Sequence, residues 1–219
     1  MTTPAGTALH QLSTPRAAAL AGVIFAVLFA TVLLLIRIKM PEGLGNSSAW
    51  LARGRSGIGA AAVLMPFAGI SFLWFIGVVR DGFGRYEDRF FATVFLGSGI
   101  LFLAMMFVAT AAAAGLVASK TTNPDVIDFA KMLVLSASKT YAIRMAAVFM
   151  ISLATIWLRT GLMPRWLVAL SYLVALAILI ASDVTMWLTL AFPAWVLVVS
   201  ALLLRAGAID VHQDQTSRD

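Results

Sequence analysis

The longest uncharged stretch of the chain decides its fold class. Between Arg89 and Lys120 the sequence reads FFATVFLGSGILFLAMMFVATAAAAGLVAS, which is 30 consecutive residues without a charge. An apolar stretch of about 20 residues is enough for a helix to cross the hydrocarbon core of a bilayer. The whole chain is 61% hydrophobic and only 12% charged, whereas about 25% of the residues in soluble domains are charged. The sequence therefore predicts an integral membrane protein.

Five further apolar runs on either side of this stretch complete a predicted bundle of six transmembrane helices. The run that follows Arg165 extends for 39 residues and is broken only by Asp183. A single helix of that length would measure about 60 Å, which is twice the hydrocarbon thickness. We therefore expect two helices joined by a turn at Ser182 or Asp183. The six predicted spans cover residues 17–36, 56–79, 90–118, 140–158, 166–181 and 184–204.

A further, amphipathic helix is predicted over residues 124–137. Asn123, Pro124 and Asp125 are typical of a helix start, since they supply a cap, a proline for the first turn and an acid near the positive end of the dipole. Apolar residues then recur at helical spacing, with Asp128 and Lys131 mostly opposite. This helix either lies at the membrane interface or continues directly into the fourth span. The predicted fold is thus one all-α transmembrane domain over residues 1–219, a bundle of six transmembrane helices plus one interfacial amphipathic helix.

Basic residues are spread almost evenly between the two sides of this topology. If the N-terminus lies inside, the inner side holds eight Lys or Arg residues and the outer side holds seven or eight, depending on Arg144. The short loops 80–89 and 159–165 are rich in Arg, and short loops carry most of the positive-inside signal, so we expect both termini in the cytoplasm. A composition rich in Ala, Val, Leu and Arg and free of Cys is typical of a high-GC bacterium. We therefore expect a multi-pass protein of a bacterial plasma membrane.

The sequence offers few residues for catalysis or metal binding. Its two histidines, His10 and His212, lie in the polar tails, and it has no cysteine. The first three spans are uncharged, whereas ionisable residues inside the membrane usually mark ion and substrate pathways. We therefore expect no catalytic residues, no metal site and no cofactor. The basic residues flank apolar runs, where they anchor helices and contact lipid, so nucleic acid is not an expected partner.

The densest polar cluster follows the second span. Residues 80–89 read RDGFGRYEDR and carry three positive and three negative charges. Arginine pairs well with carboxylate and phosphate oxygens, so this loop is a candidate site for lipid headgroups or for a partner. A solvated turn that neutralises its own charge is the alternative. The candidate binding residues are Arg80, Asp81, Arg85, Glu87, Asp88 and Arg89.

Part of this loop resembles a known transporter motif. Gly77, Asp81, Gly84 and Arg85 have the spacing of the loop between helices two and three in the major facilitator superfamily. The chain departs from that pattern at Gly82, where the family prefers a basic residue, and it has half the family's number of spans. The resemblance covers this loop alone, and it implies a cytoplasmic loop and a transport function.

Small residues recur every four positions in the first span, at Ala18, Gly22, Ala26 and Ala30. Such a helix-packing stripe lets another helix approach closely, and that helix belongs either to this chain or to a partner. These features favour a non-enzymatic accessory or scaffold subunit of a larger membrane assembly, such as a lipid-handling transport complex. Its expected partners are membrane lipids and other membrane protein subunits. The alternatives are a small six-helix transporter or channel that acts as a homo-oligomer, and a lipid-modifying enzyme that uses residues 80–89.

Overall fold

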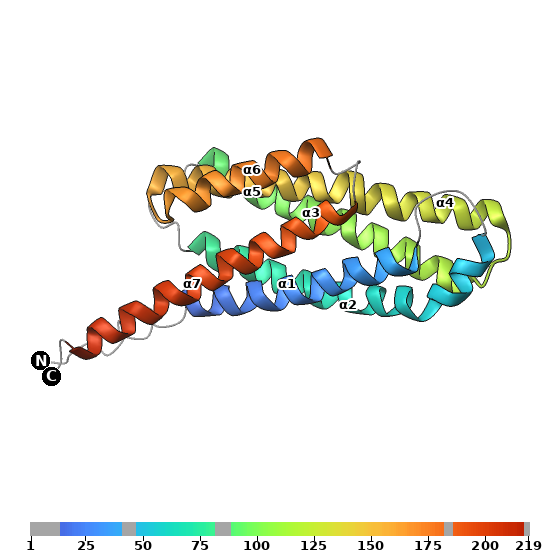
Figure 1. Cartoon of the computed structure of the whole chain (residues 1–219), viewed down its shortest axis with the longest axis horizontal. Helices are drawn as coiled ribbons and strands as arrows, with labels where there is room; N and C mark the ends of the chain where they lie inside the picture. Colours follow the sequence, from blue (N-terminus) through green and yellow to red (C-terminus); the bar gives the residue numbers. More distant parts are fainter. Residues whose placement is uncertain (1–13, 41–46, 82–88, 182–185, 217–219) are drawn as a thin grey trace, which may run out of the picture.

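The protein is an elongated bundle of helices that run side by side along one axis (Figure 1). The computed structural model describes residues 14–40, 47–81, 89–181 and 186–216. This part of the chain contains no strand, which confirms the all-α fold class. The elements are α1 (Thr14–Lys39), α2 (Ser47–Asp81), α3 (Arg89–Ser119), α4 (Pro124–Leu135), the π-helix η2 (Ser136–Ala142), α5 (Ile143–Thr160), α6 (Arg165–Ala181), the 3₁₀-helix η3 (Met186–Leu190) and α7 (Ala191–Thr216).

The first, second, third and fifth predicted spans lie on α1, α2, α3 and α6, the fourth lies on η2 and α5, and the described part of the sixth lies on η3 and α7. Five helical segments of the described chain are long and apolar enough to cross a membrane, and α6 is a shorter apolar helix of 17 residues. The long run after Arg165 is divided as expected, because α6 ends at Ala181 and η3 begins at Met186. The predicted turn residues themselves, Ser182 and Asp183, lie outside the described residues. The chain is therefore a multi-pass membrane protein.

Two helices extend well past the predicted spans. α2 begins at Ser47 rather than at residue 56, and α7 continues to Thr216 rather than ending at Leu204. The predicted limits were wrong because an uncharged run marks only the apolar part of a helix. Arg, Gln and other straight-chain residues have good helix propensity, so a helix continues through them beyond the apolar run.

The predicted helix is present as α4, and it continues directly into the fourth span. Its predicted polar side was wrong at Lys131, which is buried beside Ile127 and Val134. Asn123 caps its start, since its Oδ1 accepts a hydrogen bond of 3.0 Å from the backbone N–H of Asp125. No break separates α4, η2 and α5, which together form one 37-residue helical segment from Pro124 to Thr160. The sequence left open whether this helix lies at the membrane interface or continues into the fourth span, and the structure has the continuous arrangement. The segment ends at Gly161, whose left-handed φ of 69° favours glycine.

The π-helix η2 changes the spacing of buried residues along this segment. Ala137 and Ser138 are buried, and the next buried residues, Ala142 and Ile143, each follow five positions later. Within α5 the interval returns to three or four, as from Ala142 to Ala146. A π-turn accommodates one extra residue because its hydrogen bonds span five positions instead of four. The extra residue keeps the buried sides of α4 and α5 in line, so that both pack against α3.

Candidate functional site

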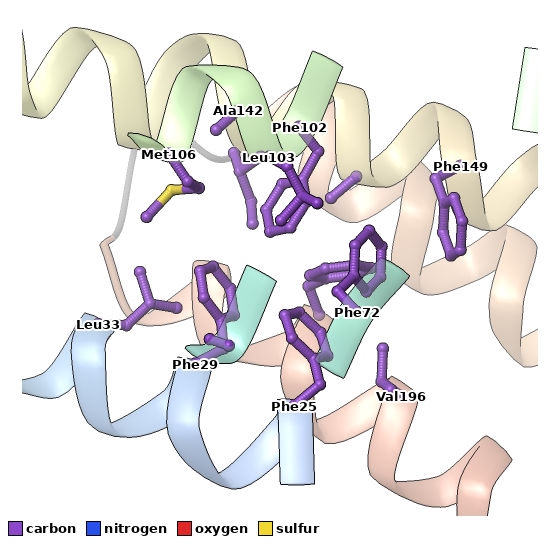
Figure 2. Close-up of a cluster of buried hydrophobic side chains, with 14 of the residues drawn as sticks. Phe25, Phe29, Leu33, Phe72, Phe102, Leu103, Met106, Ala142, Phe149 and Val196 are labelled. Atoms are coloured by element: carbon purple, nitrogen blue, oxygen red, sulfur yellow. The ribbon is translucent and has the colours of Figure 1, made fainter. Parts of the chain in front are cut away.

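Phenylalanine rings fill the centre of the bundle. An aromatic cluster is formed by residues of α1, α2, α3, α5 and α7, namely Phe25, Phe29, Phe72, Phe102, Phe149 and Phe192, all with 0% exposure. Ring centroids lie 4.5 Å apart for Phe25 and Phe72, and 5.0 Å apart for Phe102 and Phe192. Figure 2 shows Phe25, Phe29, Phe72 and Phe102 pointing toward one another. Ring pairs of this kind each add about 0.5–1.5 kcal/mol beyond the burial of their area.

The buried hydroxyl groups around the aromatic cluster bond mainly to the backbone of their own helices. Ser98 donates to the carbonyl oxygen of Val94, and Ser152 donates to that of Val148 at 2.9 Å. Such bonds satisfy a polar side chain without presenting it to a ligand. No group of three or more metal-ligating side chains occurs among the described residues. The buried Oγ of Ser200 on α7 differs from these hydroxyls, because it has no hydrogen-bond partner in the described part of the chain.

Two hydrogen bonds between side chains tie α6 to its neighbours. The indole Nε1 of Trp195 on α7 donates to Ser171 Oγ at 2.8 Å, and both side chains are buried. The hydroxyls of Thr155 on α5 and Tyr172 on α6 are 2.7 Å apart. Trp195 is buried and Tyr172 is half-buried, and the polar atoms of such aromatic side chains need a partner, which these bonds supply.

The candidate residues of the charged loop lie at one end of the bundle, as far as the structure describes them. Arg80 and Asp81 end α2, Arg89 begins α3, and all three are exposed. Arg85, Glu87 and Asp88 lie outside the described residues. The end of α5 and the start of α6 add Arg159 and Arg165, which are also exposed. Arg159 is held in place by a ring, because its Cζ lies 4.7 Å from the ring centroid of Phe91.

The helix-packing stripe of α1 faces the inside of this chain at the positions where the structure describes it. Gly22 is in close contact with Ser200 of α7, and a Cβ on Gly22 would lie 2.8 Å from Cδ2 of Phe75 on α2. Ala26 is buried, and Ala30 is half-buried. The side chain of Ala18 is not among those described. Gly22 and Ala26 therefore serve packing within the bundle, so they do not form a surface for another subunit.

Basic side chains at the other end of α1 and α2 join helices, a role that sequence analysis did not assign. The Arg37 guanidinium donates through Nη2 to Thr189 Oγ1, and its Cζ lies 5.5 Å from the ring centroid of Trp187. Arg55 donates through Nη1 to the carbonyl oxygen of Val117 at 3.0 Å, near the end of α3. In sequence these residues resemble ordinary interfacial anchors. Nothing in their local pattern indicates which helix they reach.

Comparisons with protein-family models, with curated proteins and with solved structures give no match to this chain.

Proposed function

We propose that this chain is a non-enzymatic accessory or scaffold subunit of a larger assembly in a bacterial plasma membrane. The aromatic cluster is the observation that carries the proposal. Rings from five helices contact one another across the centre of the bundle, where a transport path or a membrane-embedded catalytic site would need polar groups. A protein whose centre is packed in this way acts through its outer surface.

The charged end of the bundle is the surface proposed to bind the partner. Arg80, Arg89, Arg159 and Arg165 are exposed there, close to the limits of four helices. Arginine binds carboxylate and phosphate oxygens with two parallel hydrogen bonds, so an acidic segment of another subunit fits this end. We place this end and both termini in the cytoplasm, following the Arg-rich short loops.

The test compares the tagged wild-type chain with an Arg80→Gln/Arg89→Gln double variant. Both are produced in the native host of the protein and purified in mild detergent. We expect the wild-type chain to carry other polypeptides at fixed stoichiometry. We expect the double variant to lose them, because each charge-assisted contact contributes about 1.5–3 kcal/mol. A loss of that size lowers affinity by about tenfold or more for each contact. The ratio of companion to tagged chain, measured by quantitative mass spectrometry, reports the result.

The matched control is Lys120→Gln, which removes an exposed positive charge beyond the opposite end of α3. The companion ratio of this variant should equal that of the wild-type chain. Purification of the wild-type chain with no stoichiometric companion would contradict the accessory function. Solute or ion flux through vesicles that contain the purified chain alone would support the transporter alternative instead.

A further inference from the structure

Beyond its first turn, which holds the exposed Asp125, the outer face of α4 is apolar, while its one basic residue, Lys131, is turned inward. Lys131 is only 5% exposed, and it is buried together with Ile127 and Val134. On the opposite side Phe129 is 69% exposed and Met132 is 61% exposed. A helix surrounded by water has the reverse arrangement, because burial of a charge is costly and large apolar groups are expelled from water. The surroundings of this outer face are therefore apolar.

The same apolar surface continues along the neighbouring helix. α4 packs on α3, whose exposed side chains include Leu101, Phe107 and Val108. The same exposed side of α3 continues toward the end of the helix through small residues, namely Ala111, Gly115 and Ala118. The turn between the two helices and the first turn of α4 carry exposed polar residues, at Lys120, Thr122, Asn123 and Asp125. A continuous apolar side with a polar tip is typical of a surface in contact with lipid.

The helices on the two sides of α5 differ greatly in length. α3 carries 30 uncharged residues after Arg89, which measure about 45 Å at 1.5 Å per residue. α6 has 17 residues, which measure about 25 Å. Both pack against α5, and Figure 1 shows α4 lying beyond the end at which α6 stops. The hydrocarbon core of a typical bilayer is about 30 Å thick, so it matches α6 but not α3.

We propose that the outer face of α4, formed by Val126, Phe129, Met132 and Leu133, is covered by lipid acyl chains. The apolar belt of the protein is then about 20 Å taller along α3 and α4 than along α6. The bilayer accommodates such a hydrophobic mismatch by thickening locally, or the helices accommodate it by tilting. One flank of the bundle is thus longer than the hydrocarbon core, and the other matches it. This inference is independent of the proposed subunit function.

Site-directed spin labelling of the full chain tests the inference, and the absence of native cysteine makes single-cysteine variants direct to prepare. Nitroxide labels are placed at Phe129→Cys and Met132→Cys on the outer face of α4. The purified protein is reconstituted in phosphatidylcholine vesicles, and collision of each label with oxygen and with a water-soluble nickel chelate is measured. Oxygen concentrates in acyl chains, whereas the chelate stays in water. We expect the oxygen-to-nickel ratio at both positions to be several-fold higher than at a water-exposed site.

Two further labels calibrate the measurement. Leu173→Cys lies on α6, where the native side chain is 66% exposed, and it gives the value for lipid. Asp125→Cys lies in the exposed first turn of α4 itself and gives the value for water. Ratios at positions 129 and 132 that match Leu173→Cys support the inference. Ratios that match Asp125→Cys would place α4 in water, and low collision rates with both reagents would show that protein covers the face; either result overturns it.

Discussion

At the scale of single residues, close contact between helices depends on the few positions that lack a side chain. Gly22 lets α1 approach Ser200 and Phe75, whereas a Cβ on Gly115 would meet no atom within 4 Å. In lipid, helices associate through close packing because exclusion of water contributes little. A glycine at a crowded contact is therefore essential for packing, and a glycine on an open face is not.

Gly22→Ala and Gly115→Ala should accordingly have opposite effects on stability. Alanine favours a helix by about 1 kcal/mol relative to glycine, so Gly115→Ala should stabilise the protein slightly. At Gly22 the added methyl overpacks the contact with Phe75, which costs about 1–3 kcal/mol. The unfolding midpoint of each variant, measured by thermal denaturation in the same detergent, checks this expectation. Equal midpoints would show that α1 and α7 are not closely packed at Gly22.

Buried serines differ in importance according to the donor that they serve. Ser171→Ala would leave the buried Nε1–H of Trp195 without its acceptor, at a cost of about 1–3 kcal/mol. Ser152→Ala removes a hydroxyl that bonds only to the carbonyl of Val148, and that carbonyl keeps its place in the helix, so little change is expected. Denaturant titration of the two variants beside the wild-type chain measures the difference. A cost at Ser152 as large as at Ser171 would contradict this assignment.

At the scale of elements, η2 determines how α4 and α5 present one common buried side to α3. The interval of five from Ala137 to Ala142 replaces the usual three or four. In a regular α-helix each residue turns the helix by about 100°, so an interval of four residues would already bring the buried sides of α4 and α5 into line. η2 uses an interval of five and so contains one residue more than this alignment needs. The segment from Pro124 to Thr160 is therefore expected to tolerate the loss of a residue from η2.

Deletion of Tyr141, which is 59% exposed, should convert η2 into ordinary α-helix and leave both buried sides in register. Deletion of Leu173, which is also exposed but lies in the regular helix α6, should turn Ala175 and Ile178 away from the core by about 100°. We expect the first variant to give a folded, monodisperse protein by size-exclusion chromatography. The second should aggregate or be degraded. Equal damage from both deletions would show that η2 has a role beyond register.

At the scale of the whole molecule, α1 begins and α7 ends at the same end of the bundle (Figure 1). The turn between α3 and α4 lies at the opposite end. A reporter fused after Thr216 should therefore lie on the same side of the membrane as one fused before Thr14. A reporter inserted between Thr121 and Thr122 should lie on the opposite side. Paired phosphatase and fluorescent-protein fusions measure this, and a shared side for all three positions would contradict the arrangement of spans.

The sequence by itself was enough to determine the fold class and the helices that cross the membrane. Backbone polar groups have no water to bond with inside a bilayer. A long uncharged run such as residues 90–119 therefore forms a helix, which satisfies these groups within its own segment. The cap at Asn123 was equally readable, because it depends on residues adjacent in the chain. Local signals of these two kinds do not require knowledge of the neighbouring helices.

Only the tertiary structure decided which side of each helix faces inward. In water, polarity marks the exposed side of a helix, but in lipid an apolar residue is favourable on both sides, so the periodicity of α4 did not reveal that Lys131 is buried and Phe129 exposed. The contact of Gly22 with Ser200, the reach of Arg37 to Thr189 and the extra residue in η2 likewise depend on helices distant in sequence. These features arise from packing between helices, and packing is settled only when all of the helices are in place.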